Sequence, residues 1–282
     1  MNYQLKTDKI IIQNKDEFNS KHILECGQIF RYEKVDENTY AVYSGNKKAV
    51  IIENQTGFEI QTTDVKYFEN FFDLKTDYSL VKQQLSLQNP TMKEACLFGG
   101  GIRILKQQPF EIIISFIISA NNNIKRIQNL IKKLCEKCGT KTDDYFAFPT
   151  LEQIEALSIE DLKTMGMGFR AKYIYETVRK LKAVDLQNYY EKSTNELLNF
   201  LQTLSGVGPK VADCIALFAY NKQDCFPVDT WVEKVYNCYF SAEQISNRNL
   251  IRKNLVEIFG NSSGYAQQYL FYYKRELDKK GK

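Results

Sequence analysis

The segment best suited to chemistry is Leu204-Ser-Gly-Val-Gly-Pro-Lys-Val-Ala-Asp-Cys214, which lies between two helical patterns. Gly206 and Gly208 are two residues apart, and this spacing predicts a very tight turn between two helices. The backbone N–H groups at the start of the second helix are then bare, so a phosphate can bind them directly. A compact turn with glycines only for steric reasons fits the same pattern.

Lys210 stands in the first turn of that second helix, and Pro227-Val228-Asp229 ends nineteen residues after it. An amine is a nucleophile only when neutral, so a catalytic Lys210 requires a pKa below its ordinary value of about 10.4. Burial in a cleft and the positive end of the helix dipole both act in that direction. A lysine that merely contacts phosphate is the alternative. Asp229 precedes a predicted helix, where a carboxylate suits an N-cap and can also stabilise positive charge.

The histidine and cysteine content excludes several kinds of catalytic site. The chain has 282 residues and a single histidine, His22. Ser-His-Asp hydrolases, Cys-His proteases, two-histidine zinc sites and facial-triad iron sites are therefore excluded. Cys135 and Cys138 have metal-site spacing, but no second Cys-x-x-Cys follows among the seven cysteines. We expect reduced thiols, no metal and no cofactor.

The distribution of charge favours a polyanionic partner. Residues 101–282 carry 26 Lys/Arg against 20 Asp/Glu, while residues 1–100 carry 12 against 14. Asymmetry of this size also occurs in proteins without such a partner. No apolar run reaches the roughly 18 residues of a membrane span, and the first residues lack a signal-peptide pattern. We expect a cytoplasmic monomer with no membrane contact, located at the nucleoid if the source is prokaryotic.

The elements that position these residues change type along the chain. Five runs separated by turn residues predict an antiparallel meander: residues 9–13, 29–35, 39–43, 49–53 and 58–62. From residue 64 onward the apolar period becomes helical. Later helices are predicted over residues 111–119, 124–134, 151–157, 158–165, 171–184, 194–204, 210–220, 230–239, 249–259 and 264–277. The sequence thus predicts an α+β fold, with an antiparallel β domain and helical tail over residues 1–95 and a mostly α-helical region over residues 96–282.

The hairpin glycines, Lys210 and the spaced Pro-Val-Asp resemble the helix–hairpin–helix and Gly/Pro-rich–Asp (HhH-GPD) motif of DNA glycosylases. Four further segments resemble the 8-oxoguanine DNA glycosylases in particular: Gly27-Gln-Ile-Phe-Arg31, residues 101–126, Met167-Gly-Phe-Arg-Ala171 and Gly264-Tyr-Ala-Gln-Gln-Tyr-Leu-Phe271. The resemblance runs from about residue 20 to residue 275. It implies a TBP-like β domain and helical HhH-GPD domains that enclose a cleft. No iron–sulfur cluster is implied, because no C-x6-C-x2-C-x5-C follows Asp229.

The activity that this resemblance implies is a bifunctional DNA glycosylase/AP lyase of base excision repair. Its partner would be double-stranded DNA containing 8-oxoguanine, preferably opposite cytosine. The damaged base is flipped out, Lys210 attacks C1′ of its sugar, and the resulting Schiff base undergoes β-elimination. Asp229 would stabilise the positive charge on the sugar. Gly206, Val207 and Gly208, together with Lys210, would bind DNA phosphate.

The resemblance also implies a pocket for the flipped base. Oxidation turns N7 of guanine from an acceptor into a donor, and the backbone carbonyl of Gly27 would accept that N7–H. Gln267 would read the Watson–Crick edge, while Phe271 and Cys214 would cover the two faces of the ring. A strand-entry turn at Gly27 and a core aromatic at Phe271 are the structural alternatives.

A further set of residues would face the cytosine that extrusion leaves unpaired. Asn121, Arg126 and Arg170 match these family positions, and Phe169 matches the residue wedged into the base stack. Arginine donors fit O2 and N3 of cytosine, whereas adenine presents a donor at that edge. Solvated surface or phosphate contact is the alternative for the arginines. Phe169 replaces the usual tyrosine, and Trp231 replaces a phosphate-contacting histidine of the vertebrate-type enzymes.

Two other functions stay open at this point. One is a helix–hairpin–helix glycosylase for another damaged base, such as an alkylpurine; alkylpurine members lack the lysine, so Lys210 argues against it. The other is a non-catalytic DNA-binding protein that uses the hairpin alone. That function would leave Lys210, Asp229 and the β domain unexplained.

Overall fold

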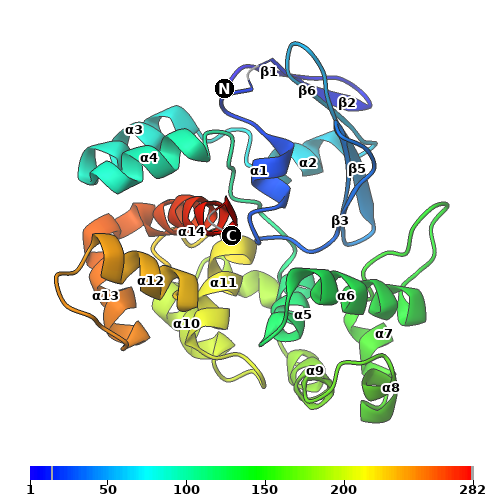
Figure 1. The fold of residues 1–282 in the computed structure, drawn as a ribbon. Helices are drawn as coiled ribbons and strands as arrows, with labels where there is room; N and C mark the ends of the chain where they lie inside the picture. Colours follow the sequence, from blue (N-terminus) through cyan, green and yellow to red (C-terminus); the bar gives the residue numbers. More distant parts are fainter. Residues whose placement is uncertain (14, 281–282) are drawn as a thin grey trace.

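A computed structural model describes residues 1–13 and 15–280 and shows a β sheet followed by a larger helical body (Figure 1). The strands are β1 (Tyr3–Leu5), β2 (Lys9–Ile12), β3 (Tyr32–Lys34), β4 (Thr39–Ser44), β5 (Lys47–Glu53) and β6 (Phe58–Gln61). They form one sheet in the order β1-β2-β6-β5-β4-β3, and every pair is antiparallel. The predicted antiparallel domain is confirmed.

The sheet differs from the predicted meander in its order and at its two edges. β2 pairs with β6, so only β3 to β6 form a meander. β1 was not predicted, since three residues give too short a run to show alternation. β3 begins three residues later than expected, at Tyr32. Phe30 packs edge-on against Phe116 of the helical body, with ring centres 5.5 Å apart. The segment around residue 30 therefore joins the sheet to the helices.

The helices account for most of the chain after residue 64 and confirm the α+β class (Figure 1). The first four along the chain are α1 (Ser20–Leu24), α2 (Val65–Phe71), α3 (Tyr78–Gln88) and α4 (Pro90–Phe98). The others are α5 (Pro109–Ser119), α6 (Ile124–Cys138), α7 (Leu151–Glu155), α8 (Ile159–Thr164), α9 (Arg170–Leu181), α10 (Thr194–Leu201), α11 (Pro209–Tyr220), α12 (Thr230–Tyr239), α13 (Arg248–Phe259) and α14 (Ser263–Lys280), with 3-10 turns η1 (Leu186–Tyr189) and η2 (Gly260–Ser262). No described helix has the length and apolar character needed to span a bilayer.

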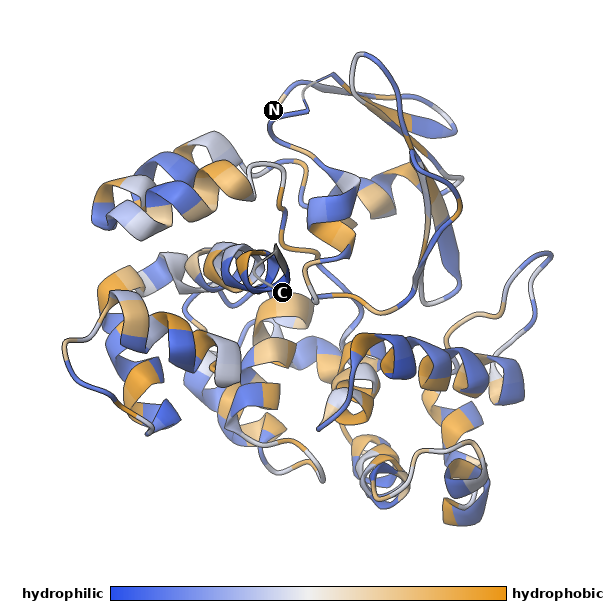
Figure 2. Cartoon of the chain, in the orientation of Figure 1, coloured by the Kyte–Doolittle hydropathy of each residue, from blue (hydrophilic) through white to orange (hydrophobic). Residues whose placement is uncertain are grey.

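The helical body has its apolar core around α5 and α11. Residues Ile112 to Ile118 of α5 are all buried, and α5 contacts α6, α9 and α11. Figure 2 shows apolar residues along α11, whereas the outer helices mix apolar and polar residues. The start of α11 is thus fixed to a rigid core, which is the support that a positioned side chain there requires.

A second apolar cluster joins α3 and α4 to the last helices. Leu85 and Met92 are fully buried in it, together with Tyr269 of α14. α14 contacts α4, α12 and α13, and Figure 1 shows α3 and α4 beside it. The predicted domain boundary between residues 95 and 96 falls inside α4. As a division of the chain into domains it stays a prediction.

Candidate active site and DNA interface

The turn between α10 and α11 has the geometry expected of a phosphate-binding hairpin. Gly206 has a φ of +81°, in the region that favours glycine, and Val207 is only 5% exposed. Gly208 is the N-cap of α11 and Pro209 is its first residue. Val207 therefore anchors the turn in the core, while the first N–H groups of α11 have no carbonyl of their own helix to bind.

The two glycines of this turn have different surroundings, and we expect different effects from replacing each. A Cβ at Gly206 would lie 2.7–2.9 Å from three atoms of Tyr173, whereas a Cβ at Gly208 would meet no described atom within 4 Å. Gly206→Ala should lower the free energy of unfolding by about 1–3 kcal/mol through its backbone conformation alone. Gly208→Ala should leave stability unchanged and weaken duplex binding, since its methyl group covers the bare N–H groups. Thermal unfolding and duplex titration of both variants provide the check; equal stability loss in both would contradict this account.

Lys210 lies half-buried in the first turn of α11, with its Nζ 5.6 Å from the ring centre of Phe116. Cys214 follows one turn later on the same helix face and is buried. Burial raises the pKa of the Cys214 thiol to about 11, so this group is a neutral thiol at pH 7. The Cys214 side chain is close enough to Lys210 to raise the pKa of the amine.

The charge state of Lys210 corrects one expectation from the sequence. Burial lowers the pKa of Lys210, but its interactions with Cys214 and the Asp229 carboxylate outweigh burial, and the pKa is raised above its ordinary value. The expected fall is therefore wrong for the DNA-free protein. The sequence argument counted burial and the helix dipole and left out the partners that hold the proton on the amine.

Asp229 lies where both of its predicted roles are possible. It is the N-cap of α12, and its Oδ1 accepts N–H bonds from Trp231 and Val232, each of 2.9 Å. These two hydrogen bonds confirm the predicted cap and hold the carboxylate in a fixed position. The effect of Asp229 on the pKa of Lys210 shows that its charge acts on the amine.

Gly27 and the helix α14, which carry most residues of the predicted base pocket, lie against each other. The pocket itself stays a prediction. Gly27 has a φ of +89°, and a Cβ there would lie 3.3 Å from Cε1 of Phe271. Gln267 precedes Phe271 by one turn of α14 and is 6% exposed. Its Oε1 is buried and has no hydrogen-bond partner among the described residues. A buried acceptor without a donor is rare in folded proteins, so Gln267 is suited to a donor-bearing ligand.

The residues predicted to face the unpaired base come from two segments and differ in exposure. Asn121 and Arg126 lie in the loop before α6 and in its first turn, whereas Phe169 and Arg170 lie at the start of α9. Asn121 and Arg126 are exposed, and Asn121 has a φ of +48°. Phe169 is 53% exposed, as a residue wedged into a base stack must be. Arg170 is only 4% exposed and donates through Nε and Nη2 to the carbonyl oxygen of Ala120, and through Nη2 to that of Asn121.

The structure therefore separates the two arginines. Arg126 lies in the first turn of α6. Burial of Arg170 lowers the pKa of Arg170, and the positive charge of Arg126 lowers it further. Nε and Nη2 of Arg170 are used by the loop between α5 and α6, and Nη1 donates to the carbonyl oxygen of Met167. In the DNA-free protein Arg170 supports the backbone at Asn121, and its direct contact with an unpaired base stays a prediction.

Two buried side chains near Gly27 were not assigned a role from the sequence. Nε2 of Gln28 donates to the carbonyl oxygens of Ile23 and Arg103 and so holds the turn in place. Arg275 lies two turns after Gln267 on α14 and contacts the ring of Phe271. The i, i+4, i+8 spacing of Gln267, Phe271 and Arg275 could have suggested that all three share a face.

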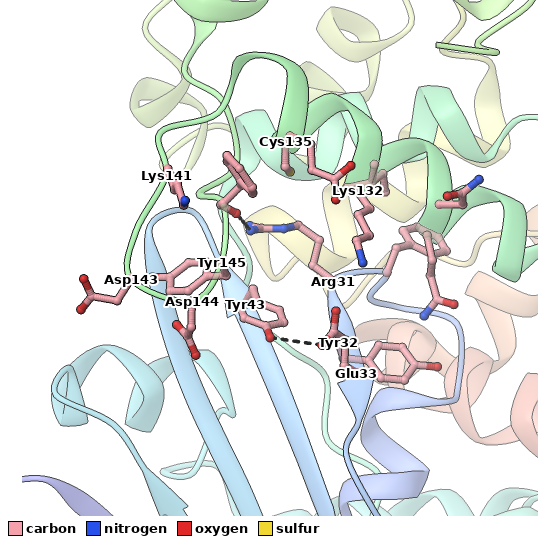
Figure 3. A pocket seen from close by; sticks show the side chains of 16 residues that line it. Arg31, Tyr32, Glu33, Tyr43, Lys132, Cys135, Lys141, Asp143, Asp144 and Tyr145 are labelled. Carbon is pink, nitrogen blue, oxygen red and sulfur yellow. Dashed lines mark hydrogen bonds between the residues drawn. The ribbon is translucent and has the colours of Figure 1, made fainter.

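A separate cavity of about 560 Å³ lies between the sheet, α6 and the loop after it. Figure 3 shows Lys132 of α6 and Glu33 of β3 projecting toward it, with Arg31 behind them. Arg31 is fixed there by the carbonyl oxygens of Gly45 and Phe146. None of the predicted site residues lines this cavity.

Comparisons with known proteins agree with the geometry along the whole chain. Residues 10–113 match the family described as 8-oxoguanine DNA glycosylase, N-terminal domain, and residues 114–260 match the HhH-GPD superfamily base excision DNA repair proteins. The N-glycosylase/DNA lyase of Saccharomyces cerevisiae is 31% identical over 92% of this chain and 84% of its own. A probable N-glycosylase/DNA lyase of Methanothermobacter thermautotrophicus is 30% identical over 76% of each chain. A Clostridium acetobutylicum 8-oxoguanine glycosylase/lyase, solved with DNA containing cytosine opposite 8-oxoG, is 38% identical over 99% of both chains, with a TM-score of 0.92.

Proposed function

Because this chain belongs to the 8-oxoguanine DNA glycosylase family of HhH-GPD base excision repair proteins, we propose that it excises 8-oxoguanine from duplex DNA and then cleaves the strand. The observation that carries the proposal is the placement of Lys210. Lys210 stands at the start of α11, directly after the phosphate-binding turn, and the Asp229 carboxylate is close enough to raise the pKa of its amine.

The reaction begins with the sugar of the extruded nucleotide held near Lys210. The neutral amine forms a bond to C1′ as the bond from C1′ to N9 breaks, and the base leaves with the electron pair and takes up a proton. Asp229 stabilises the positive charge that develops on the sugar during this step. Ring opening then gives the imine, and β-elimination expels the 3′ phosphate and cuts the strand. An enzyme that used only activated water would not need this lysine.

Recognition of the lesion precedes the chemistry and uses the pocket at Gly27. The backbone carbonyl of Gly27 accepts the N7–H of 8-oxoguanine, whereas guanine would place two acceptors against each other. Phe271 and Cys214 cover the faces of the base, and the unpaired Oε1 of Gln267 accepts from its Watson–Crick edge.

A cleavage assay on four duplexes tests this function. Each duplex carries 8-oxoguanine opposite one of the four bases, and an undamaged duplex of the same sequence is the control. We expect strand cleavage at the lesion and intact control duplex. Lesion duplexes that stay intact at high protein excess would favour a non-catalytic DNA-binding protein. A further duplex that carries an alkylated purine tests the other glycosylase class, and loss of the base from this duplex alone would favour that class.

The raised pKa of Lys210 predicts a rate that increases with pH. Below this pKa the neutral fraction of the amine rises about tenfold for each pH unit, and only the neutral form attacks. Single-turnover excision should therefore speed up from pH 6 to pH 9. Duplex binding by Lys210→Gln over the same range controls for pH effects on affinity. A rate that does not change with pH would show that the ammonium loses its proton on DNA binding.

A further inference from the structure

Arg275 of α14 is a buried cation with one nitrogen, Nη1, that donates no hydrogen bond to the described residues. Its side chain is 8% exposed. Nη2 donates to the carbonyl oxygen of Glu25, and Nε and Nη2 lie 3.2 and 3.1 Å from Oε1 of Glu276. Nη1 is buried as well and finds no acceptor among the described residues. Leaving a buried donor of a charged group unpaired costs free energy, so this atom is suited to an acceptor from outside the chain.

The unused donor lies at the edge of the proposed base pocket. Nη1 is 3.7 Å from the point that a Cβ of Gly27 would occupy, and Phe271 approaches the same point to 3.3 Å. The guanidinium carbon is 5.4 Å from the ring centre of Phe271. An acceptor that lay over Phe271 beside Gly27 would therefore be within reach of Arg275.

Position along α14 decides which edge of the base would face Arg275. Gln267, Phe271 and Arg275 follow one another at single-turn spacing, so they lie in a row about 12 Å long on one helix face. Gln267 at one end has a buried acceptor without a donor, and Arg275 at the other end has a buried donor without an acceptor. A base stacked on Phe271 with its Watson–Crick edge at Gln267 turns its five-membered ring toward Arg275.

That ring carries the atoms that distinguish 8-oxoguanine from guanine. Oxidation adds a carbonyl oxygen, O8, next to the new N7–H, where guanine has a C8–H that cannot accept. We propose that Nη1 of Arg275 donates a hydrogen bond to O8 of the extruded base, while the carbonyl of Gly27 accepts from N7–H. Arg275 is then a specificity-determining residue for the lesion. The inference rests on the proposed function, because it requires 8-oxoguanine in this pocket.

Equilibrium binding by an inactive protein tests the role of Arg275 directly. The Lys210→Gln protein is titrated with duplexes carrying 8-oxoguanine or guanine opposite cytosine, and the ratio of the two dissociation constants is the lesion preference. Adding Arg275→Met, which keeps an unbranched apolar stem, should lower this preference at least about tenfold by weakening only lesion binding. Arg275→Lys should lower it too, because one ammonium cannot hold the Glu25 carbonyl and reach O8 in the geometry of a guanidinium.

Lys274→Met is the matched control for the loss of a positive charge. Lys274 precedes Arg275 on α14 and pairs with Asp278, so its replacement should leave the lesion preference unchanged. Thermal unfolding of each variant shows whether it folds, and Arg275→Lys supplies the test if Arg275→Met does not.

Three results would overturn the assignment or its premise. Equal weakening of lesion and guanine binding by Arg275→Met would show that Arg275 only supports the turn at Gly27. An increased lesion preference would show that Arg275 donates to the N7 acceptor of guanine instead. If Lys210→Gln with Arg275 intact has no lesion preference, the proposed function itself fails, and this outcome is distinct from the other two.

Discussion

Replacing Lys210 by glutamine should abolish strand cleavage and covalent trapping while duplex binding survives. Sodium borohydride reduces the imine between the amine and the sugar, so the wild-type protein should give a stable protein–DNA adduct on lesion-containing duplex. Glutamine keeps much of the length of the side chain but has no nucleophilic nitrogen. The excision rate should fall by at least about 10³-fold, as expected when a nucleophile is removed. Gel electrophoresis of the trapped adduct and single-turnover kinetics measure both effects.

Lys253→Gln is the control for losing one positive charge from the helical region. Lys253 is exposed on α13 and pairs only with Glu257 among the ion pairs of the described residues. Its replacement should leave trapping and cleavage at wild-type levels. If Lys210→Gln still formed the adduct in full, another amine would be the nucleophile and the site described here would have a different function.

Replacing Arg126 should change only the preference for cytosine as the opposite base, whereas replacing Arg170 should change both this preference and the stability of the protein. Hydrogen bonds to a base edge discriminate by about 1–3 kcal/mol, so excision opposite cytosine should exceed excision opposite adenine at least tenfold. Arg126 is exposed in the first turn of α6, and Arg126→Ala should reduce this ratio without lowering stability. Arg170→Ala removes the donors that hold the Ala120 and Asn121 carbonyl oxygens. It should therefore lower thermal stability as well as the ratio.

Single-turnover rates opposite all four bases separate these effects. A uniform fall in all four rates for Arg126→Ala would identify Arg126 as a phosphate contact. Similar wild-type rates opposite all four bases would contradict the assignment of this loop, even if Lys210 is the nucleophile.

The sequence was most informative where chemistry depends on local spacing. The tight turn at Gly206 and the cap at Asp229 are both set by residues within a few positions, and the structure shows both. The antiparallel strands and the later helices follow from alternation and period in the same way. The five-residue helix α1 and the strand β1 are too short to produce such a pattern.

Properties that depend on contacts between residues far apart in the chain could not be predicted from the sequence. The pKa of Lys210 depends on its burial in the folded protein, on Cys214, and on Asp229, which is nineteen residues away in the chain. The burial of Arg170 follows from the loop at Ala120, which is fifty residues earlier in the chain. Arg275 meets Glu25 across most of the sequence, and nothing near Arg275 indicates that one of its donors lacks an acceptor.

The attachment point of the trapped DNA tests the central claim most directly. The borohydride-reduced adduct of the wild-type protein can be digested with nuclease and protease, and the modified peptide sequenced by mass spectrometry. We predict that the residual sugar is carried by the side-chain nitrogen of Lys210, in the peptide that contains the hairpin turn. Attachment to any other amine, such as the chain's N-terminus or Lys222, would contradict the assignment of Lys210 as the nucleophile.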